Sequence, residues 1–320
     1  MKIRSRDVTR IKTRPINALR LGGHGDTLGG VRSLTAGALL ASSLVAGGSV
    51  LLAGLAARRL ITPSPSETQF LTPWELGISY RDISFVTADG LKLKGWWLPN
   101  PGARRTVVAL CGYNSARHHV LGISAALWRG GANVLLFDNR GRGDSEGETV
   151  SLGYYERLDA EAAVGYAKSR SKELPLGVIG YSMGGAVGIM VAAEDDRIEA
   201  LVVDSPFASQ TALLRARLRD YVGPLEYPAF ALASRFLDYE PGEVEPAGAV
   251  PRVAPRPILF IHGEEDTVTA PEDSRRMYDL AGEPKELWLV PGAGHIGSYY
   301  RDRESYCRRV NAFFEKHLTD

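Results

Sequence analysis

The sequence contains little that would indicate a metal centre, a disulfide framework or a nucleic-acid partner. Only two cysteines occur among 320 residues, Cys111 and Cys307, and their separation fits no metal-ligand spacing. We expect both to be small thiols in or near the core, and they leave the redox compartment open. The net charge of +1 gives no case for nucleic acid as a partner. No repeat, metal-ligand set or phosphate-cradling glycine loop is visible, so we expect no cofactor and no metal.

Charge is also missing from one long stretch near the N-terminus. Residues 33–57 contain no ionisable side chain, whereas residues 1–32 are polar and mostly basic. A run of this length is sufficient to cross a hydrocarbon core as a helix. We predict a basic flexible tail at 1–32, a transmembrane signal anchor at 33–57 and a proline-stiffened linker at 58–79.

Two other interpretations of the uncharged run remain open. A cleaved signal peptide would have a shorter apolar core and a clearer cleavage site than the sequence offers near Ala56. A buried helix of a soluble domain is seldom free of charge over this length. Basic residues are more numerous before the run than after it, which favours a cytoplasmic N-terminus. We therefore predict a single-pass membrane protein whose catalytic domain lies on the extracytoplasmic side.

Residues 80–320 show the pattern of one α/β domain. Alternating apolar and polar residues over 82–86 and 91–98, on either side of Ala88-Asp89-Gly90, predict a hairpin. Apolar strands and helices then alternate to the end of the chain, which predicts an open, mostly parallel sheet with helices on both faces. In such a sheet the functional site lies at the carboxyl ends of the strands.

The segment Gly180-Tyr181-Ser182-Met183-Gly184 lies between an apolar strand at 175–179 and an apolar helix at 186–193. A strand that turns into a helix across Gly-x-Ser-x-Gly is a nucleophile elbow, in which a sharp turn raises the serine hydroxyl above the sheet. Gly180 and Gly184 are expected here because side chains would collide across the turn. Ser182 is the predicted nucleophile. The competing interpretation is a glycine-rich turn with a surface serine.

A serine hydroxyl is a poor nucleophile unless a base takes its proton. Among six histidines, His295 lies in a glycine-rich loop directly after the strand predicted at 287–290, and it is our candidate base. His119, just past the turn that follows the strand at 106–110, is the second choice.

The base needs a carboxylate that fixes its tautomer. Asp266 follows the strand at 257–261 and is the candidate, with Glu264 and Glu265 as alternatives by position. The resulting chain order of serine, acid and histidine is the one expected on this architecture.

The oxyanion formed in acyl transfer needs preorganised N–H donors. The backbone of Met183, at a helix N-terminus, is one candidate, and the backbone N–H of Tyr113 in the turn after the strand at 106–110 is the other.

Charged residues also follow the strand predicted at 133–137. Asp144 and Glu146 lie in its glycine-rich loop, and we expect a local salt bridge to Arg140 or Arg142 to account for them.

The chain resembles the α/β-hydrolase superfamily over residues 80–318. The motifs that carry the resemblance are Gly180-Tyr181-Ser182-Met183-Gly184-Gly185, the loop at 138–147, His262-Gly263-Glu264-Glu265-Asp266 and Gly294-His295. Within the superfamily it is similar to bacterial serine aminopeptidase-like hydrolases, several of which carry an N-terminal membrane segment. That family usually has His-Gly at the oxyanion turn, where this chain has Cys111-Gly112. The resemblance implies hydrolysis through an acyl-enzyme on Ser182, His295 and Asp266.

We predict a serine hydrolase that cleaves the carboxylic ester of a small-molecule acyl substrate. Residues 206–256 are apolar and aromatic, and we expect a small helical cap over the site that favours acyl chains, the alternative being an ordinary crossover helix with a long loop. A peptidase or acyltransferase on the same triad is an alternative within enzymes. A catalytically silent, membrane-tethered binding protein is the alternative outside them.

Overall fold

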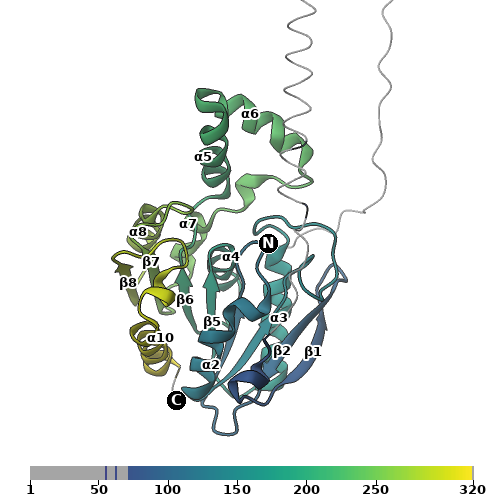
Figure 1. The fold of residues 1–320 in the computed structure, drawn as a ribbon, viewed down its shortest axis with the longest axis vertical. Coiled ribbons are helices and arrows are strands. Elements are labelled where there is room, and N and C mark those ends of the chain that lie inside the picture. The colour runs from purple at the N-terminus through teal and green to yellow at the C-terminus, as the bar shows by residue number, and fades with distance from the viewer. Residues whose placement is uncertain (1–54, 56–61, 63–70, 319–320) are drawn as a thin grey trace, which may run out of the picture. The chain divides into compact units, whose positions relative to one another are not determined.

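Figure 1 shows a computed structural model of the chain, which describes residues 55, 62 and 71–318. Eight strands in this part form one sheet in the order β1-β2-β4-β3-β5-β6-β7-β8. The β1/β2 and β2/β4 pairs are antiparallel, and the other neighbouring pairs are parallel. The strands are β1 (Arg81–Val86), β2 (Lys92–Leu98), β3 (Arg105–Leu110), β4 (Ala132–Phe137), β5 (Leu176–Tyr181), β6 (Ala200–Asp204), β7 (Ile258–Gly263) and β8 (Lys285–Val290).

Helices cover both faces of this sheet, as predicted (Figure 1). Helices α3, α4 and α8 pack on one face, and α2 and α10 pack on the other. The α-helices are α2 (Leu121–Arg129), α3 (Glu156–Arg170), α4 (Met183–Ala192), α5 (Gln210–Val222), α6 (Glu226–Ala233), α7 (Pro246–Ala249), α8 (Pro271–Leu280), α9 (Ser298–Arg301) and α10 (Arg303–His317). The 3₁₀ turns are η1 (Pro73–Leu76), η2 (Arg117–Val120), η3 (Gly223–Leu225), η4 (Ser234–Phe236), η5 (Pro241–Glu243) and η6 (Val250–Arg252).

The central strands are apolar throughout because both of their faces are covered. In β3, Val108 and Leu110 belong to the core that contains α4, whereas Val107 and Ala109 belong to the core that contains α2 and α10. All six residues of β3 are buried. The continuous apolar runs that the sequence shows at β3, β4, β5 and β7 are therefore interior strands, and the fold predicted from them is confirmed.

Residues 206–256, predicted to form a helical cap, contain α5, α6 and α7. Helices α5 and α6 contact each other and stand away from the sheet (Figure 1). Large apolar side chains on and between them are exposed, including Tyr221, Leu225 and Tyr227.

The membrane anchor predicted at 33–57 lies outside the described residues, apart from Leu55. Within the part of the chain that the structure describes, every helix is too short or too polar to span a bilayer.

Candidate active site

The backbone at Ser182 has the sharp geometry predicted for a nucleophile elbow. Ser182 stands between β5 and α4 with φ 51° and ψ −116°, a strained conformation for a residue with a side chain. A Cβ atom on Gly180 would lie 2.2 Å from the carbonyl oxygen of Gly184, and one on Gly184 would lie 2.4 Å from that of Leu110. Both positions therefore require glycine. The Ser182 amide donates to the Asp204 carbonyl at 2.8 Å, which fixes the turn to β6.

The structure brings Ser182, His295 and Asp266 into one hydrogen-bonded chain. Ser182 Oγ lies 2.9 Å from His295 Nε2, and His295 Nδ1 lies 2.8 Å from Asp266 Oδ2. Because the carboxylate only accepts, Nδ1 carries the proton and Nε2 accepts from the serine hydroxyl. The three side chains come from the loops after β5, β7 and β8, at the carboxyl ends of parallel strands.

Asp266 is buried and receives several hydrogen bonds. Its Oδ1 accepts from the amides of Val268 and Thr269 at 2.8 and 3.0 Å, and its Oδ2 accepts from the Thr269 hydroxyl at 3.0 Å. His262 Nε2 lies 3.2 Å from the same Oδ2. Burial opposes ionisation, but the bonds from His262 and His295 outweigh it and hold the pKa of Asp266 well below its usual range.

The alternatives by position have other surroundings, although His119 lines the same cavity as Ser182 and His295. Glu264 and Glu265 are exposed, although they are adjacent in sequence to Asp266. His119 Nδ1 is engaged with the Ser115 hydroxyl at 2.8 Å and the Ala116 amide at 3.2 Å within its own turn. The Ser182 hydroxyl donates instead to His295 Nε2.

The two predicted oxyanion donors belong to segments next to Ser182. Met183 is the first residue of α4, so its N–H is one of those that lack an intrahelical acceptor. A Cβ atom on Gly112 would lie 3.5 Å from Ser182 Cβ, so the turn that carries Tyr113 packs against the nucleophile. Met183 stands at a helix N-terminus, where negative charge is stabilised, which suits its predicted role.

The loop after β4 holds this turn in place. Arg142 is almost fully buried and donates from Nη2 to the Asn114 carbonyl at 2.9 Å. Asn139 Nδ2 donates to the Cys111 carbonyl at 3.4 Å. Asn114 has a positive φ of 54°, so the backbone of this turn is strained. The side chains of Arg142 and Asn139 thus donate hydrogen bonds to the backbone on both sides of Tyr113.

Within the loop at 138–147 we expected Asp144 and Glu146 to form a salt bridge with Arg140 or Arg142. For Asp144 the structure shows a different partner. Asp144 pairs with Arg117, which comes from η2 and lies 2.7 Å away. Arg117 also pairs with the buried Asp138 at the end of β4. Two acids of the loop, Asp138 and Asp144, therefore share one arginine that follows β3 in the chain.

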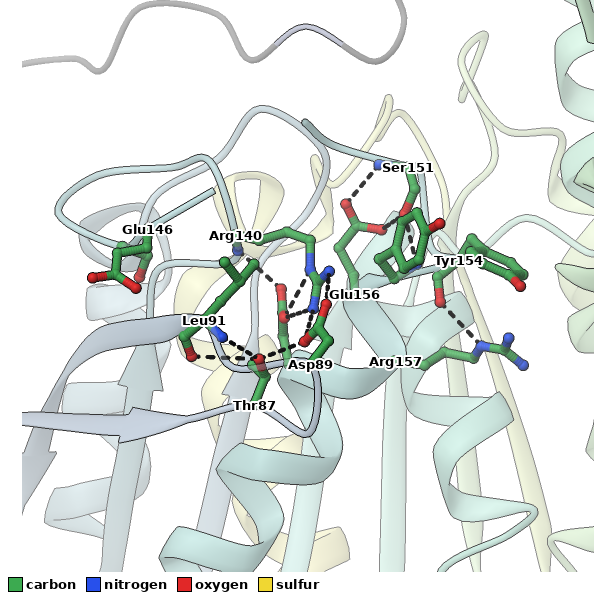
Figure 2. Close-up of polar contacts among 12 residues, drawn as sticks. Thr87, Asp89, Leu91, Arg140, Glu146, Ser151, Tyr154, Glu156 and Arg157 are labelled. Atoms are coloured by element: carbon green, nitrogen blue, oxygen red, sulfur yellow. Dashed lines mark hydrogen bonds and ion pairs between the residues drawn. The ribbon is translucent and has the colours of Figure 1, made fainter. Parts of the chain in front are cut away.

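Arg140 has a separate role in the same loop. Its guanidinium donates to Asp159 on α3. It also donates to Asp89 in the β1–β2 turn, as Figure 2 shows. Burial works against the charged form, but these carboxylates outweigh it and raise the pKa of Arg140. Glu146 accepts from the Lys92 amide at 2.8 Å. Arg140 and Glu146 therefore tie the hairpin to the sheet, away from Ser182.

Sequence reasoning missed a buried network beneath the histidine loop. Ser205, at φ 54°, accepts on Oγ from the Ile296 amide at 3.2 Å and donates to Asp204 Oδ1 at 3.0 Å. The Tyr306 hydroxyl donates to Asp204 Oδ2 at 2.9 Å. Burial raises the pKa of Asp204 to about 6. The signal was an aspartate at the end of β6, where polar residues follow a buried strand.

A cavity of about 360 Å³ opens beside Ser182 and His295. Its other walls come from the turn after β3, the start of α2 and the segment around α9. The expected cap segment 206–256 contributes none of the described residues that line it.

Among described residues no cluster of His, Cys, Asp and Glu could hold a metal ion. Cys111 is buried and Cys307 half-buried, both as free thiols.

Comparisons with known proteins give one consistent picture. Residues 101–228 match the family Hydrolase_4, described as serine aminopeptidase, S33. The chain is 32% identical to Rv2307c of Mycobacterium tuberculosis over 264 residues, which cover 79% of this chain and 85% of that protein. It is 31% identical to YqkD of Bacillus subtilis over 192 residues, or 58% of this chain and 63% of that one. The solved Pyrococcus furiosus esterase Pf2001 superposes with a TM-score of 0.68 at 30% identity, over 80% of this chain and 99% of that one.

Proposed function

The chain belongs to the serine aminopeptidase-type (S33) family of α/β-hydrolases, and from this premise we propose that it is a serine hydrolase that cleaves carboxylic esters through an acyl-enzyme. The observation that carries the proposal is the unbroken hydrogen-bonded chain from Ser182 through His295 to Asp266. The likeness to the Pyrococcus furiosus esterase favours an ester over other acyl substrates.

Acylation begins when Ser182 Oγ adds to the carbonyl carbon of the ester and its proton passes to His295 Nε2. The backbone N–H groups of Met183 and Tyr113 stabilise the charge that develops on the carbonyl oxygen. The intermediate collapses as the bond to the alcohol oxygen breaks, and His295 returns its proton to the departing alkoxide. Asp266 stays ionised throughout and stabilises the imidazolium.

Deacylation repeats these steps with water as the nucleophile. His295 Nε2 takes a proton from water, the hydroxyl adds to the acyl carbon, and the second intermediate collapses to a carboxylic acid. The proton returns to Ser182 Oγ, which restores the free enzyme. The depressed pKa of Asp266 suits this cycle, because a carboxylate that stays charged can stabilise the imidazolium.

The test is a pair of serine variants. Ser182→Ala should lose turnover of p-nitrophenyl butyrate by on the order of 10⁴-fold or more and lose labelling by a fluorophosphonate probe. Ser169→Ala, an exposed serine on α3, is the control and should retain both. Circular dichroism of each variant checks that the fold is intact. Retained turnover in a folded Ser182→Ala protein would sink the proposal.

A peptidase or an acyltransferase could use the same triad. A hydrolase fold without catalytic activity could instead act as a membrane-tethered binding protein. Probe labelling that depends on Ser182 separates the enzymes from the binding protein. Product analysis with added alcohol separates hydrolysis from acyl transfer, because a transferase forms a new ester in preference to the free acid.

We further propose that residues 33–57 anchor the chain in a membrane with the hydrolase domain on the extracytoplasmic side. The proposal rests on the absence of ionisable side chains from this run and on the basic residues before it. The full-length protein should sediment with membranes and resist extraction by high salt, whereas residues 71–320 should not sediment. A full-length protein that stays in the supernatant after lysis contradicts the anchor.

A further inference from the structure

The cavity beside Ser182 is built by parts of the fold other than the expected cap. Val120 and Ile123 come from the end of η2 and the start of α2. Ile296 follows the base, and Tyr299 and Tyr300 come from α9. Helices α2 and α9 meet there, because a Cβ atom on Gly122 would lie 2.3 Å from the Tyr299 hydroxyl. The shape of the cavity is therefore set by α2 and α9.

The wall of this cavity is mostly apolar, and its titratable groups are tyrosines and the two histidines His119 and His295. Among the described residues that line it, none is an aspartate, glutamate, lysine or arginine. Burial raises the pKa of Tyr113 and of Tyr299, so both rings stay neutral. The guanidinium of Arg303 lies 5.2 Å from the Tyr299 ring centroid, but Arg303 does not line the cavity. A ligand here meets mainly aliphatic and aromatic carbon, with a few hydroxyl and imidazole groups.

We propose that this cavity, and not the segment 206–256, is the acyl-binding pocket, and that it accepts an uncharged aliphatic acyl group. The inference rests on the proposed function of Ser182. At about 30 Å³ for each small heavy-atom group, a cavity of about 360 Å³ holds on the order of a dozen non-hydrogen atoms. The substrate is thus an ester of a short or medium-chain acid.

This pocket excludes the substrates of an aminopeptidase. An aminopeptidase must bind the ammonium group next to the scissile carbonyl, and an ammonium that loses water without gaining a carboxylate partner is strongly disfavoured. The described lining of the cavity offers no such carboxylate. The activity in the family description therefore does not carry over to this chain, although the fold does.

The first experiment varies Ile123, which lines the pocket on α2. In the unmodified protein, kcat/KM for p-nitrophenyl esters should rise by about fourfold per added methylene until the pocket is full. Ile123→Trp should move the optimum to acyl chains shorter by roughly two carbons, and Ile123→Ala to longer ones by a similar amount. Leu225→Ala, in the exposed part of the helical segment, is the control and should leave the profile unchanged.

A second series separates the acyl side from the alcohol side. Acetate esters of alcohols of increasing length should show no shift in preference when Ile123 is changed. If the Ile123 variants alter the alcohol preference and not the acyl preference, the cavity binds the leaving group and the inference is wrong. If Leu225→Ala moves the acyl optimum instead, the segment 206–256 forms the pocket.

The absence of a carboxylate is tested with two esters of one carbon skeleton. The ethyl ester of 4-methylpentanoic acid should be hydrolysed about a hundredfold or more faster than the ethyl ester of leucine at pH 7. Faster hydrolysis of the leucine ester overturns the inference. Failure to hydrolyse any ester, together with absent fluorophosphonate labelling, would instead mean that the proposed function itself is wrong.

Discussion

The carboxyl edge of the sheet and the exposed part of the helical segment 206–256, around Tyr221 and Leu225, hold their side chains in opposite ways. At the edge, charged groups such as Asp138, Arg142 and Asp266 are buried and hydrogen-bonded to other loops. In the segment, Tyr221 is 86% exposed and Leu225 62% exposed. Buried charges are costly unless their geometry is satisfied, so each network fixes the loops that supply it. Positions at the edge should therefore be sensitive to single-atom changes, and exposed positions of the segment such as Tyr221 and Leu225 should not.

The largest effect is expected from removing one charge at Asp266. Asp266→Asn keeps an acceptor for the Val268 and Thr269 amides but loses the carboxylate that orients His295. Turnover of p-nitrophenyl butyrate should fall by about 10³- to 10⁴-fold, with a thermal midpoint near that of the unmodified protein. Glu265→Gln, the exposed neighbour, should change turnover little. A greater loss in Glu265→Gln than in Asp266→Asn would reassign the acid.

A smaller but specific effect is expected at Arg142, which holds the turn carrying Tyr113. Arg142→Ala should lower kcat by roughly ten- to a hundredfold with little change in KM, because the lost contact acts on the oxyanion donor and not on the acyl pocket. Arg142→Lys should recover part of the loss.

Arg140→Lys is the matched control for Arg142, since Arg140 lies in the same loop but binds Asp159 and Asp89. It should lower the thermal midpoint while kcat stays within about twofold. If both arginine positions lower stability and leave kcat alone, Arg142 is structural only.

Asp204 makes the free energy of unfolding depend on pH. Burial raises its pKa to about 6, whereas the unfolded chain releases this proton near the usual 3.8. The folded state therefore binds more protons between these values, and the free energy of unfolding falls as pH rises from about 4 to 6. Relative to Asp204→Asn, the unmodified protein should lose on the order of 3 kcal/mol across this window.

Urea unfolding of both proteins at several pH values from 4 to 7 measures this difference. Other titrating carboxyls, such as Asp159 and Asp266, are common to the two proteins and cancel in the comparison. Stability curves that run parallel from pH 4 to 7 would show that Asp204 titrates normally.

The smallest effect is expected on the exposed helical segment. Tyr221→Ser should change the free energy of unfolding by less than about 0.5 kcal/mol and kcat/KM for a butyrate ester by less than about twofold. Equilibrium unfolding and steady-state kinetics check both. A large change in kcat/KM would mean that the segment acts on the cavity after all, and the contrast between the two regions would fail.

The local sequence pattern was sufficient to predict a residue's role where that role follows from its position at the end of a strand. The apolar runs predicted the strands, and Gly-x-Ser-x-Gly between a strand and a helix predicted the turn at Ser182. The loops after β7 and β8 were predicted to supply Asp266 and His295, which lie within hydrogen-bonding distance of each other. Parallel strands bring their carboxyl ends to one edge whatever the intervening sequence, so this proximity follows from topology.

Pattern was not sufficient where a side chain had several possible partners. The partner of Asp144 is Arg117 and not a residue of its own loop, because loop curvature decides which of several arginines is near. Spacing alone did not choose among Glu264, Glu265 and Asp266, of which only the last is buried. The apolar composition of 206–256 suggested a cap over the site. Composition alone, however, does not say against which part of the fold a segment packs.

The sequence by itself determined the sheet, the elbow and the loops at which chemistry is possible, because these depend on the period and length of apolar runs and on where glycine is required. Only the tertiary structure decided which walls surround Ser182, which loop holds the turn at Tyr113 and which aspartate lies beneath the histidine loop. These depend on contacts between segments far apart in the chain, such as Gly122 with Tyr299 and Arg142 with Asn114, and contacts of that kind leave no periodic signal in the sequence.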